Sequence, residues 1–291
     1  MSDDLQALMS DLIRLTSTDL PPDVEAALQR ARHAEALDSA ARGTLDTILH
    51  NVALARRNAT PICQDTGTPI FFVRYPPGQS PRELRSAIQA AVAQATHQSL
   101  LRPNAVHPLS GNNTGDNLGG DHFPTLHFTE AEDDTLTIDL ILKGGGSENV
   151  GTQYSLPNEN LQASRDLDGV RRTILDAVYR AQGRGCAPGV LGVAIGGDRS
   201  SGYQASKQVF LRSLDDRHPD PQIAALEENW LAAANQLGIG PMGFGGQTTL
   251  LGLKIAVLHR LPACYFVTIS YMCWAFRRRR LTLRQGLALF S

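Results

Sequence analysis

TLTIDLILKGGGSEN, residues 135–149, is the stretch of this sequence that decides the fold. Large aliphatic side chains recur there at every second position: Leu136, Ile138, Leu140 and Leu142. A period of two is typical of a β-strand with one buried face. The strand runs directly into three consecutive glycines and the polar residues 147–149, so we expect a tight, polar loop at its end.

Further elements are predicted on both sides of this strand. Apolar residues at helical spacing, clearest in residues 44–57, indicate helices. The expected helices are residues 44–57, 81–101, 168–182 and 221–237. The expected strands are residues 70–74, 124–129, 190–195 and 250–258, with one more inside 261–276, and residues 124–129 are expected to pair with 135–143. This pattern predicts an α+β fold, with helices packed around a mixed or antiparallel sheet.

The composition is that of an ordinary globular protein. The chain has 291 residues, of which 42% are hydrophobic and 19% charged, and its formal net charge is -2. A near-neutral chain does not suit general nucleic-acid binding, which depends on basic side chains that neutralise phosphates. We therefore expect no nucleic-acid partner.

We expect neither a signal peptide nor a membrane span in this sequence. Acidic residues stand near the N-terminus, where a signal peptide would have a basic segment followed by an apolar one. Leu261–Phe276 is an uncharged run of 16 residues, too short for the roughly 20 that a membrane span needs, and it contains Pro262. The expectation is a cytoplasmic protein with a buried strand in this run. Arg277–Arg280 is interpreted as a solvated end rather than a polyanion site.

Two nucleotide-binding motifs are matched only in part. Residues 238–243 have the G-x-G-x-x-G spacing of a dinucleotide site, but a predicted helix rather than a strand precedes them. Residues 197–202 have the glycine spacing of a phosphate loop, yet Tyr203 and Gln204 stand where Lys and Ser or Thr are needed. Neither nucleotide site is expected.

The chain has four cysteines, Cys63, Cys186, Cys264 and Cys273. They are too few and too scattered for a disulfide framework, and scattered cysteines are commonly inert buried residues. Three of them, however, lie in loops near polar, Gly-rich segments. Three thiolates from distant segments suit a 4Fe-4S cluster with one iron left open as a Lewis acid. An inert structural role and a cluster role both remain open from the residues alone.

Five ordered motifs carry a family resemblance. They are CQDTGT at 63–68, NTGDN at 113–117, KGGGSEN at 143–149, GCAPG at 185–189 followed by IGGDR at 195–199, and YMCWA at 271–275. Together they resemble class I fumarate hydratase, the iron-sulfur-dependent fumarase, and the related alpha chain of tartrate dehydratase. The resemblance extends from about Thr44 to Arg278. The KGGGSEN and NTGDN motifs look like the fumarase branch.

The resemblance implies a 4Fe-4S cluster held by three cysteines, Cys63, Cys186 and Cys273. Cys264 competes for the third position, but Cys273 stands in the motif that resembles the family's Cys-Trp-Ala followed by a basic residue. In the expected α+β fold, the cluster loops gather at one edge.

The same resemblance implies residues that contact a small dicarboxylate substrate. These are Gln64, Asp65, Arg102, Gly145, Gly146 and His259. Asp65 could instead only stabilise an Asx turn, and Arg102 could be a cation at a helix C-terminus. Gly145 and Gly146 could form a simple turn at the strand end, and His259 lies about two residues too far from Cys273 for the family spacing. Their roles are expectations from the family alone.

The resemblance also implies an organisation and a reaction. We expect an N-terminal helical segment at residues 1–43, an iron-sulfur hydro-lyase alpha-type catalytic domain at 44–280, and an atypical tail at 281–291. The implied reaction is reversible hydration of fumarate to L-malate, with the catalytic base on a beta-type chain or downstream domain. A homo-oligomer is expected. The alternatives are the alpha subunit of L-tartrate dehydratase, and an inactive cluster-bearing or regulatory subunit or truncated product.

Overall fold

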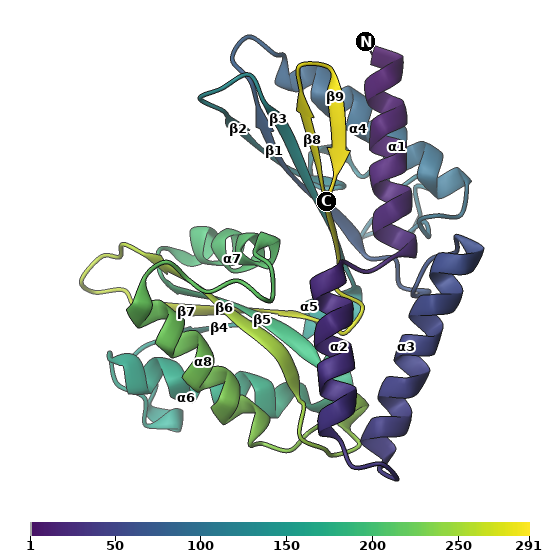
Figure 1. Ribbon diagram of the computed structural model, residues 1–291. Helices are drawn as coiled ribbons and strands as arrows, with labels where there is room; N and C mark the ends of the chain where they lie inside the picture. The colour runs from purple at the N-terminus through teal and green to yellow at the C-terminus, as the bar shows by residue number, and fades with distance from the viewer. Residues whose placement is uncertain (1) are drawn as a thin grey trace. The chain divides into compact units, whose positions relative to one another are not determined.

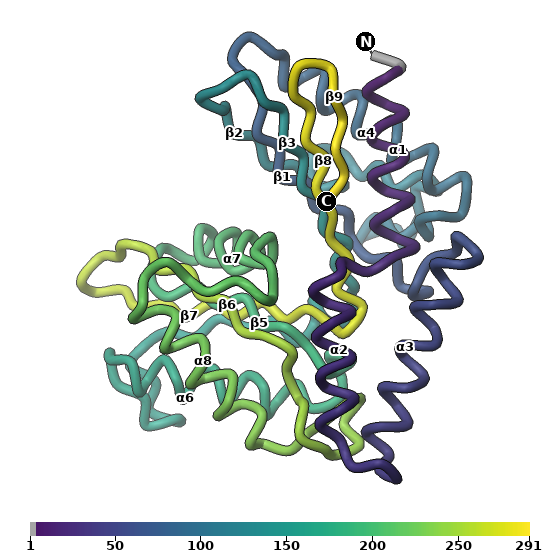
Figure 2. Tube along the Cα trace, viewed as in Figure 1, coloured from purple at the N-terminus to yellow at the C-terminus, as the bar shows by residue number. Residues whose placement is uncertain are grey.

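The computed structural model describes residues 2–291, and contacts within the chain form two compact units. Unit 1 comprises Met1–Pro21, His50–Gly145 and Ala275–Ser291, and unit 2 comprises Pro22–Leu49 and Gly146–Trp274. Figure 2 shows the three segments of unit 1 in purple, in blue to teal and in yellow. Segments far apart in the sequence pack on a common sheet in unit 1.

Unit 1 is built on a mixed five-stranded sheet with the order β2-β1-β3-β8-β9. Its strands are β1 (Thr68–Tyr75), β2 (Thr125–Glu130), β3 (Leu136–Lys143), β8 (Arg277–Arg284) and β9 (Leu287–Phe290). β2 is parallel to β1, and the other neighbouring strands are antiparallel. The expected direct pairing of residues 124–129 with 135–143 is wrong, because β1 lies between them.

One face of this sheet is covered by α1 (Ser2–Thr18) and α4 (Pro81–His97) (Figure 1). The alternating leucines and isoleucines of β3 point toward these helices and are buried, as the sequence predicted. Ser80 begins α4 by accepting a hydrogen bond from the backbone of Glu83. The helix ends at His97, four residues before the sequence pattern suggested, and Ser99 takes a left-handed backbone with φ of +61°.

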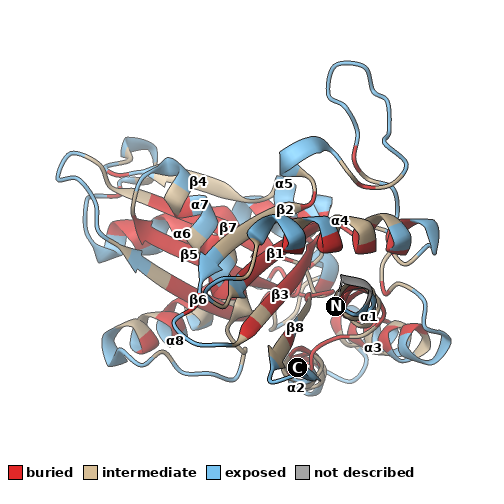
Figure 3. Ribbon diagram, turned by 90° about the horizontal axis from the view of Figure 1, so that it is seen from above, coloured by how far each residue is buried: buried red, intermediate tan, exposed pale blue. Residues whose placement is uncertain are grey.

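Unit 2 is built on a mixed four-stranded sheet with the order β4-β7-β5-β6. Its strands are β4 (Thr152–Ser155), β5 (Gly189–Gly196), β6 (Leu250–Leu258) and β7 (Phe266–Met272). β5 is parallel to β6 and antiparallel to β7. Both sheets are mixed and helices cover them, so the expected α+β class is confirmed. The strands β1, β3, β5, β6 and β7 are largely buried, whereas β2, β4 and β9 contain no buried residue (Figure 3).

Helices cover both faces of the unit 2 sheet (Figure 1). α6 (Leu167–Ala181) and α8 (Pro221–Asn235) bury Ile174 and Trp230 against one face. α7 (Arg199–Gln208) covers the other face, where Gly192 lets it approach. A Cβ at Gly192 would lie 1.9 Å from the carbonyl oxygen of Ser206. The helices expected from periodicity are therefore present at close to the predicted bounds.

The remaining elements are helical. α2 (Pro22–Ala34) belongs to unit 2, whereas the chain passes between the units within α3 (Ala40–Asn58) and α5 (Gly145–Asn149). Short 3-10 turns lie at Gly120–His122, Glu159–Leu161, Gln182–Gly185, Val209–Leu211 and Pro241–Gly243.

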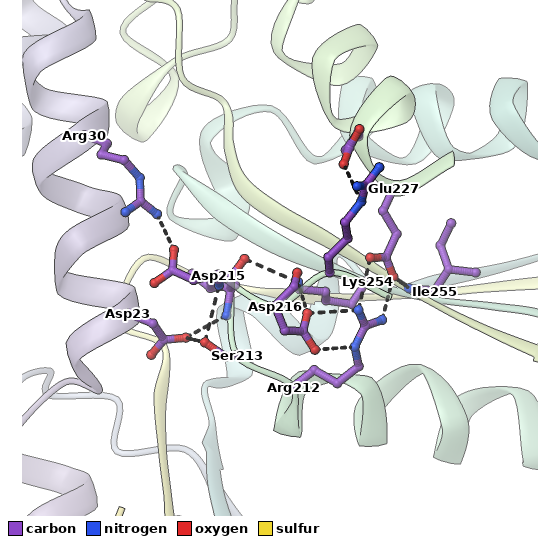
Figure 4. Close-up of polar contacts among 12 residues, drawn as sticks. Asp23, Arg30, Arg212, Ser213, Asp215, Asp216, Glu227, Lys254 and Ile255 are labelled. Atoms are coloured by element: carbon purple, nitrogen blue, oxygen red, sulfur yellow. Dashed lines mark hydrogen bonds and ion pairs between the residues drawn. The ribbon is translucent and has the colours of Figure 1, made fainter. Parts of the chain in front are cut away.

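Polar contacts fix α2 within unit 2 (Figure 4). Asp23 accepts hydrogen bonds from the backbone N–H of Leu214 at 2.7 Å and from the hydroxyl of Ser213 at 3.1 Å. Further along the helix, Arg30 pairs with Asp215 at 2.8 Å. An early helix is thereby held to a loop almost 200 positions later in the sequence.

The loop at residues 212–216 is also held by charged side chains of α8 and β6 (Figure 4). Arg212 donates to both Asp216 and the buried Glu227, at 2.8 Å and 2.6 Å. Lys254, which is 4% exposed, donates to Asp216 and to two backbone carbonyls. Glu227 also accepts from the backbone N–H of Ile255 at 2.7 Å. Each buried charge has partners, as low-dielectric surroundings require.

The apolar run at residues 261–276 contains one buried strand, β7, as expected. None of the helices in residues 2–291 combines the length and the apolar character that crossing a bilayer requires. The interpretation of Arg277–Arg280 as a solvated end is wrong. These residues begin β8, which pairs with β3, and Arg277 is only 1% exposed.

Candidate active site

In unit 2, Cys186 and Cys273 lie at the same edge of the sheet. Cys186 precedes β5 and Cys273 follows β7, and these strands are antiparallel with Val190 opposite Met272. The start of β5 therefore meets the end of β7. The backbone N–H of Trp274 donates to the carbonyl oxygen of Cys186 at 3.1 Å, so the two cysteine loops are also joined directly. Two of the three expected cluster ligands are brought together by strand pairing.

Cys186 has an unusual backbone conformation. Its φ of +56° and ψ of +61° lie in the left-handed region, just after the 3-10 turn Gln182–Gly185. This conformation costs a residue with a Cβ about 1–2 kcal/mol of conformational free energy, whereas glycine adopts it without that cost. The loop around Cys186 therefore carries local backbone strain.

Tyr271 lies beside both cysteines and was not anticipated from the sequence. Its side chain is 2% exposed, and its hydroxyl has no hydrogen-bond partner among the described residues. Burial raises the pKa of Tyr271, and electrostatic interaction with Cys273 and Cys186 raises it further. The position of Tyr271 two residues before Cys273 was the only sequence signal for it.

The ring of Tyr271 fits because its neighbours have no side chains. A Cβ at Gly185 would lie 2.6 Å from the ring atom Cε1, and one at Gly189 would lie 2.4 Å from the hydroxyl oxygen. These are the two glycines of the GCAPG motif, on either side of Cys186. The motif therefore shapes a loop around a buried phenol.

Cys264 and His259 lie at the opposite edge of the same sheet. Cys264 precedes β7 and His259 follows β6, whose last residue pairs with the end of β5. The length of one strand, about 20 Å, separates this edge from Cys186 and Cys273. Within unit 2 the structure thus separates His259 from the cysteine pair with which it was expected to act. His259 is exposed there, consistent with a surface histidine.

In unit 1, the loop that carries Cys63 is fixed through Asp65. The Asp65 carboxylate accepts from the backbone N–H of Gly67 at 3.0 Å and from that of Gly145 at 2.7 Å. The first bond is the Asx turn that the sequence allowed. The second ties the turn to the glycine run after β3. Both carboxylate oxygens of Asp65 hold the loop, and the N–H of Gly145 is directed to Asp65.

Close backbone approach explains Gly67. Its φ is +80°, and a Cβ at this position would lie 2.6 Å from the carbonyl carbon and oxygen of Lys143. Lys143 itself ends β3 and is 2% exposed. Loop and strand end can touch only where Gly67 carries no side chain.

Arg277 holds the same loop by hydrogen bonds to backbone carbonyl groups, a role that was not predicted from the sequence. Its Nη2 donates to the carbonyl oxygen of Asp65 at 2.8 Å, and its Nε donates to the carbonyl oxygen of Ala275 at 3.3 Å. Its Nη1 is buried without a partner among the described residues. The signal that could have identified Arg277 was the basic residue following Cys273-Trp274-Ala275-Phe276.

Arg102 is attached to the Cys63 loop by its backbone. Its N–H donates to the hydroxyl of the buried Thr66 at 2.9 Å, and its carbonyl accepts from the side chain of Asn117 at 2.9 Å. The guanidinium is exposed and forms no ion pair within residues 2–291. Because α4 ends at His97, Arg102 is not a C-terminal helix cation. Its charge is available for an anion.

The NTGDN motif is used to build the loop that holds Arg102. The Asn117 side chain is 1% exposed and also accepts from the backbone N–H of Asn104 at 2.6 Å. Asn113 donates to the carbonyl oxygen of Pro103 at 2.9 Å and accepts from Gly115 at 2.8 Å. These amides satisfy backbone groups that the long loop would otherwise leave unpaired.

For Gln64 and Gly146, the remaining two residues expected to contact substrate, the structure gives no specific polar contact. Gln64 is exposed, beside Cys63 in the same loop. Gly146 belongs to unit 2, where a Cβ would lie 3.8 Å from the carbonyl oxygen of Arg184 in ordinary van der Waals contact. Within residues 2–291, no three His, Cys, Asp or Glu side chains form a group that could hold a metal ion. Cys63 is in unit 1, and the other two expected ligands are in unit 2.

Comparison with known proteins shows which sequences this chain is similar to. A family profile described as fumarate hydratase (Fumerase) matches residues 6–282. A protein of Geobacillus stearothermophilus named for class I fumarate hydratase is 50% identical over 273 residues, covering 93% of this chain and 53% of that protein. This chain therefore spans about half the length of that relative.

Two further relatives are covered almost completely. The L(+)-tartrate dehydratase subunit alpha of Escherichia coli K12 is 31% identical over 290 residues, which cover 97% of this chain and 92% of that subunit. A Methanocaldococcus jannaschii protein named for the same subunit is 35% identical over 272 residues, covering 92% and 93%.

Proposed function

The chain belongs to the fumarate hydratase family, and we propose that it is the cluster-binding part of an iron-sulfur hydro-lyase that hydrates fumarate reversibly to L-malate. Residues 44–280 form the alpha-type catalytic part in this proposal. The observation that carries it is the pairing of β5 with β7, which places Cys186 and Cys273 at one sheet edge and Cys264 at the other.

The type of donor, although not an assembled group of three side chains in residues 2–291, supports a 4Fe-4S cluster. Thiolates are the protein ligands of such clusters, and Cys186 keeps its thiol in a backbone conformation that favours glycine. The buried Tyr271 hydroxyl, which lacks a hydrogen-bond partner among the described residues, belongs to a ring that packs against Gly185 and Gly189, the glycines on either side of Cys186. We propose Cys186 and Cys273 as two ligands and Cys63 as the third. When bound, a cluster with an iron that lacks a protein ligand supplies a Lewis acid.

The residues of this chain have separate tasks in the proposal. Arg102 presents an exposed planar guanidinium that can bind a substrate carboxylate through two hydrogen bonds. Asp65 and Arg277 hold the Cys63 loop by hydrogen bonds to its backbone. The exposed Gly146 can offer its N–H to a carboxylate oxygen because no Cβ covers it, whereas the N–H of Gly145 is available only if it releases Asp65. Asp65 is proposed to assist proton transfer through the lone pairs that its bonds to Gly67 and Gly145 leave available.

A partner is part of the proposal. The relatives covered at 92–93% are named as alpha subunits, and the relative named for fumarate hydratase is about twice as long as this chain. We therefore propose that a beta-type chain or downstream region supplies the catalytic base. A cytoplasmic homo-oligomer acting on a small dicarboxylate completes the proposal.

Tartrate dehydration is the second candidate. The almost complete coverage of two proteins named for tartrate dehydratase alpha subunits favours it. The 50% identity to the relative named for fumarate hydratase favours fumarate. Both reactions need the same cluster and the same recognition of carboxylates, so rates with fumarate, L-malate and L-tartrate decide between them.

Iron binding is the direct test of the ligand assignment. After anaerobic reconstitution, the wild-type chain is expected to hold about four irons, as one 4Fe-4S cluster requires. Cys63→Ser, Cys186→Ser and Cys273→Ser should each lose most of the iron and acid-labile sulfide. Cys264→Ser is the matched control and should keep them. Iron retained by Cys273→Ser but lost by Cys264→Ser would contradict the assignment, and a wild-type chain without iron would contradict the cluster.

A further inference from the structure

The unpartnered hydroxyl of Tyr271 is the most unusual polar group near the cysteine pair. Four buried side-chain atoms in the described chain lack a hydrogen-bond partner: Tyr271 Oη, Arg277 Nη1, Arg278 Nη1 and Arg279 Nε. The three arginines are cations with several other N–H groups, but the phenol of Tyr271 has a single polar atom. Burying a hydroxyl without a partner is unfavourable, so such groups are rare in folded proteins.

The surroundings of Tyr271 are built around its hydroxyl end. Gly185 and Gly189 contact the ring where any side chain would overlap it, and the Gly189 position lies closest to the oxygen. Between these glycines stands Cys186 in its left-handed conformation, and Cys273 follows two residues after Tyr271. The pairing of Tyr271 with Leu191 keeps the ring at the cysteine edge of the sheet.

We propose that Tyr271 is a positioning residue whose hydroxyl donates a hydrogen bond to a cysteine sulfur of the bound cluster at the Cys186–Cys273 edge. This inference rests on the proposed function, because the acceptor is a thiolate that binds iron. A phenol O–H is a donor of the right kind, since a thiolate sulfur accepts hydrogen bonds. The bond would satisfy the buried hydroxyl when the cluster is present.

The consequence is a shift in the cluster's reduction potential. Hydrogen bonds to the sulfur atoms of an iron-sulfur cluster help to set its potential, because they stabilise the more negative, reduced form. Removing the donor is therefore expected to lower the potential and to leave the cysteine ligands in place. The contribution to folding of the chain without iron should be small, because no protein group accepts the bond.

The test uses Tyr271→Phe in the full chain, with Tyr265→Phe as the matched control. Tyr265 is half-buried at the opposite end of β7, where it packs under Arg260. All three proteins are reconstituted anaerobically, and iron and sulfide are measured first. Reductive titration followed by electron paramagnetic resonance then gives the potential. Thermal unfolding of the iron-free chains gives a readout that does not depend on the cluster.

We expect equal iron in the three proteins, a more negative potential in Tyr271→Phe alone, and an iron-free Tyr271→Phe chain that unfolds at or above the wild-type temperature. Equal iron with equal potentials would overturn the inference and leave the proposed function standing. A Tyr271→Phe chain that does not fold would also overturn it, because the hydroxyl would then have a structural role. A wild-type chain that binds no iron would refute the proposed function first and the inference with it.

Discussion

Arg277 shows how one buried side chain can hold a functional loop. A guanidinium at 1% exposure forms no ion pair within residues 2–291, yet it donates to the carbonyl oxygens of Asp65 and Ala275. Desolvating this charge is unfavourable, and the two backbone bonds recover part of that loss. The position is therefore explained by what it holds, the turn that carries Cys63.

Arg277→Met should loosen that turn and lower the free energy of unfolding. The substitution keeps an apolar stem but removes the donor to the carbonyl oxygen of Asp65, which costs about 1–3 kcal/mol if that group is left unpaired, whereas the carbonyl oxygen of Ala275 keeps the backbone N–H of residue 277 as a donor. Urea unfolding measures the stability, and the rate of Cys63 alkylation measures loop opening. Arg284→Met is the control, since Arg284 is exposed at the end of the same strand. Equal effects of the two substitutions would contradict the role given to Arg277.

At the scale of elements, the cysteine edge of unit 2 depends on glycines that admit a ring. β5 begins at Gly189, and Tyr271 of β7 occupies the space that a Cβ at Gly189 would fill. The GCAPG motif is thus explained by close packing of two paired strands as well as by its cysteine. The backbone of Gly189 is not in the left-handed region, so the close packing of Tyr271, and not the backbone conformation, requires glycine at this position.

Gly189→Ala is expected to destabilise the chain by roughly 1–3 kcal/mol, the usual cost of overpacking a well-filled interior. The added methyl group would lie 2.3 Å from Cζ of Tyr271, so the ring or the strand must move. Gly43→Ala serves as the opposite control. Gly43 lies in α3 with no atom within 4 Å of its Cβ position, so alanine there should stabilise by roughly 0.5–1 kcal/mol. Thermal or urea unfolding should show a lower stability for Gly189→Ala and a higher stability for Gly43→Ala. A Gly189→Ala chain as stable as the wild type would contradict the packing explanation.

At the scale of the whole molecule, each unit is assembled from segments that are distant in sequence. β8 returns from the C-terminal end to pair with β3, and α2 is fixed to unit 2 through Leu214 and Asp215. The residues proposed for the reaction are distributed in the same way, with Cys63, Asp65 and Arg102 in unit 1 and Cys186 and Cys273 in unit 2. The proposed beta-type partner adds the base.

Catalysis should consequently require that partner. The reconstituted chain alone is expected to hydrate fumarate slowly, because a positioned base contributes about 10²–10⁴-fold in rate. Adding a separately produced beta-type chain should raise malate formation by that order. Adding the same partner to iron-free Cys186→Ser is the control and should give no increase. Rapid malate formation by the purified chain, free of host fumarase, would show that it carries its own base.

The sequence by itself determined the class of fold, most elements and the chemistry of the family. The alternation in residues 136–142 and the helical spacing in 44–57 are local patterns, so they could be identified without knowing what packs against them. The order of the five motifs predicted family membership, which the comparisons confirmed. The Asx turn at Asp65 was also predictable, because its hydrogen bond closes within three residues.

Only the tertiary structure decided which of these residues meet. Strand order put β1 between β2 and β3, although their sequences suggested direct pairing. The antiparallel register of β5 and β7 placed Cys273 beside Cys186 and put Cys264 and His259 at the far edge. The burial of Arg277 and Tyr271 likewise depends on partners up to 212 positions away along the chain. Local sequence carries no information on such pairings, because strand register and burial are set by long-range packing.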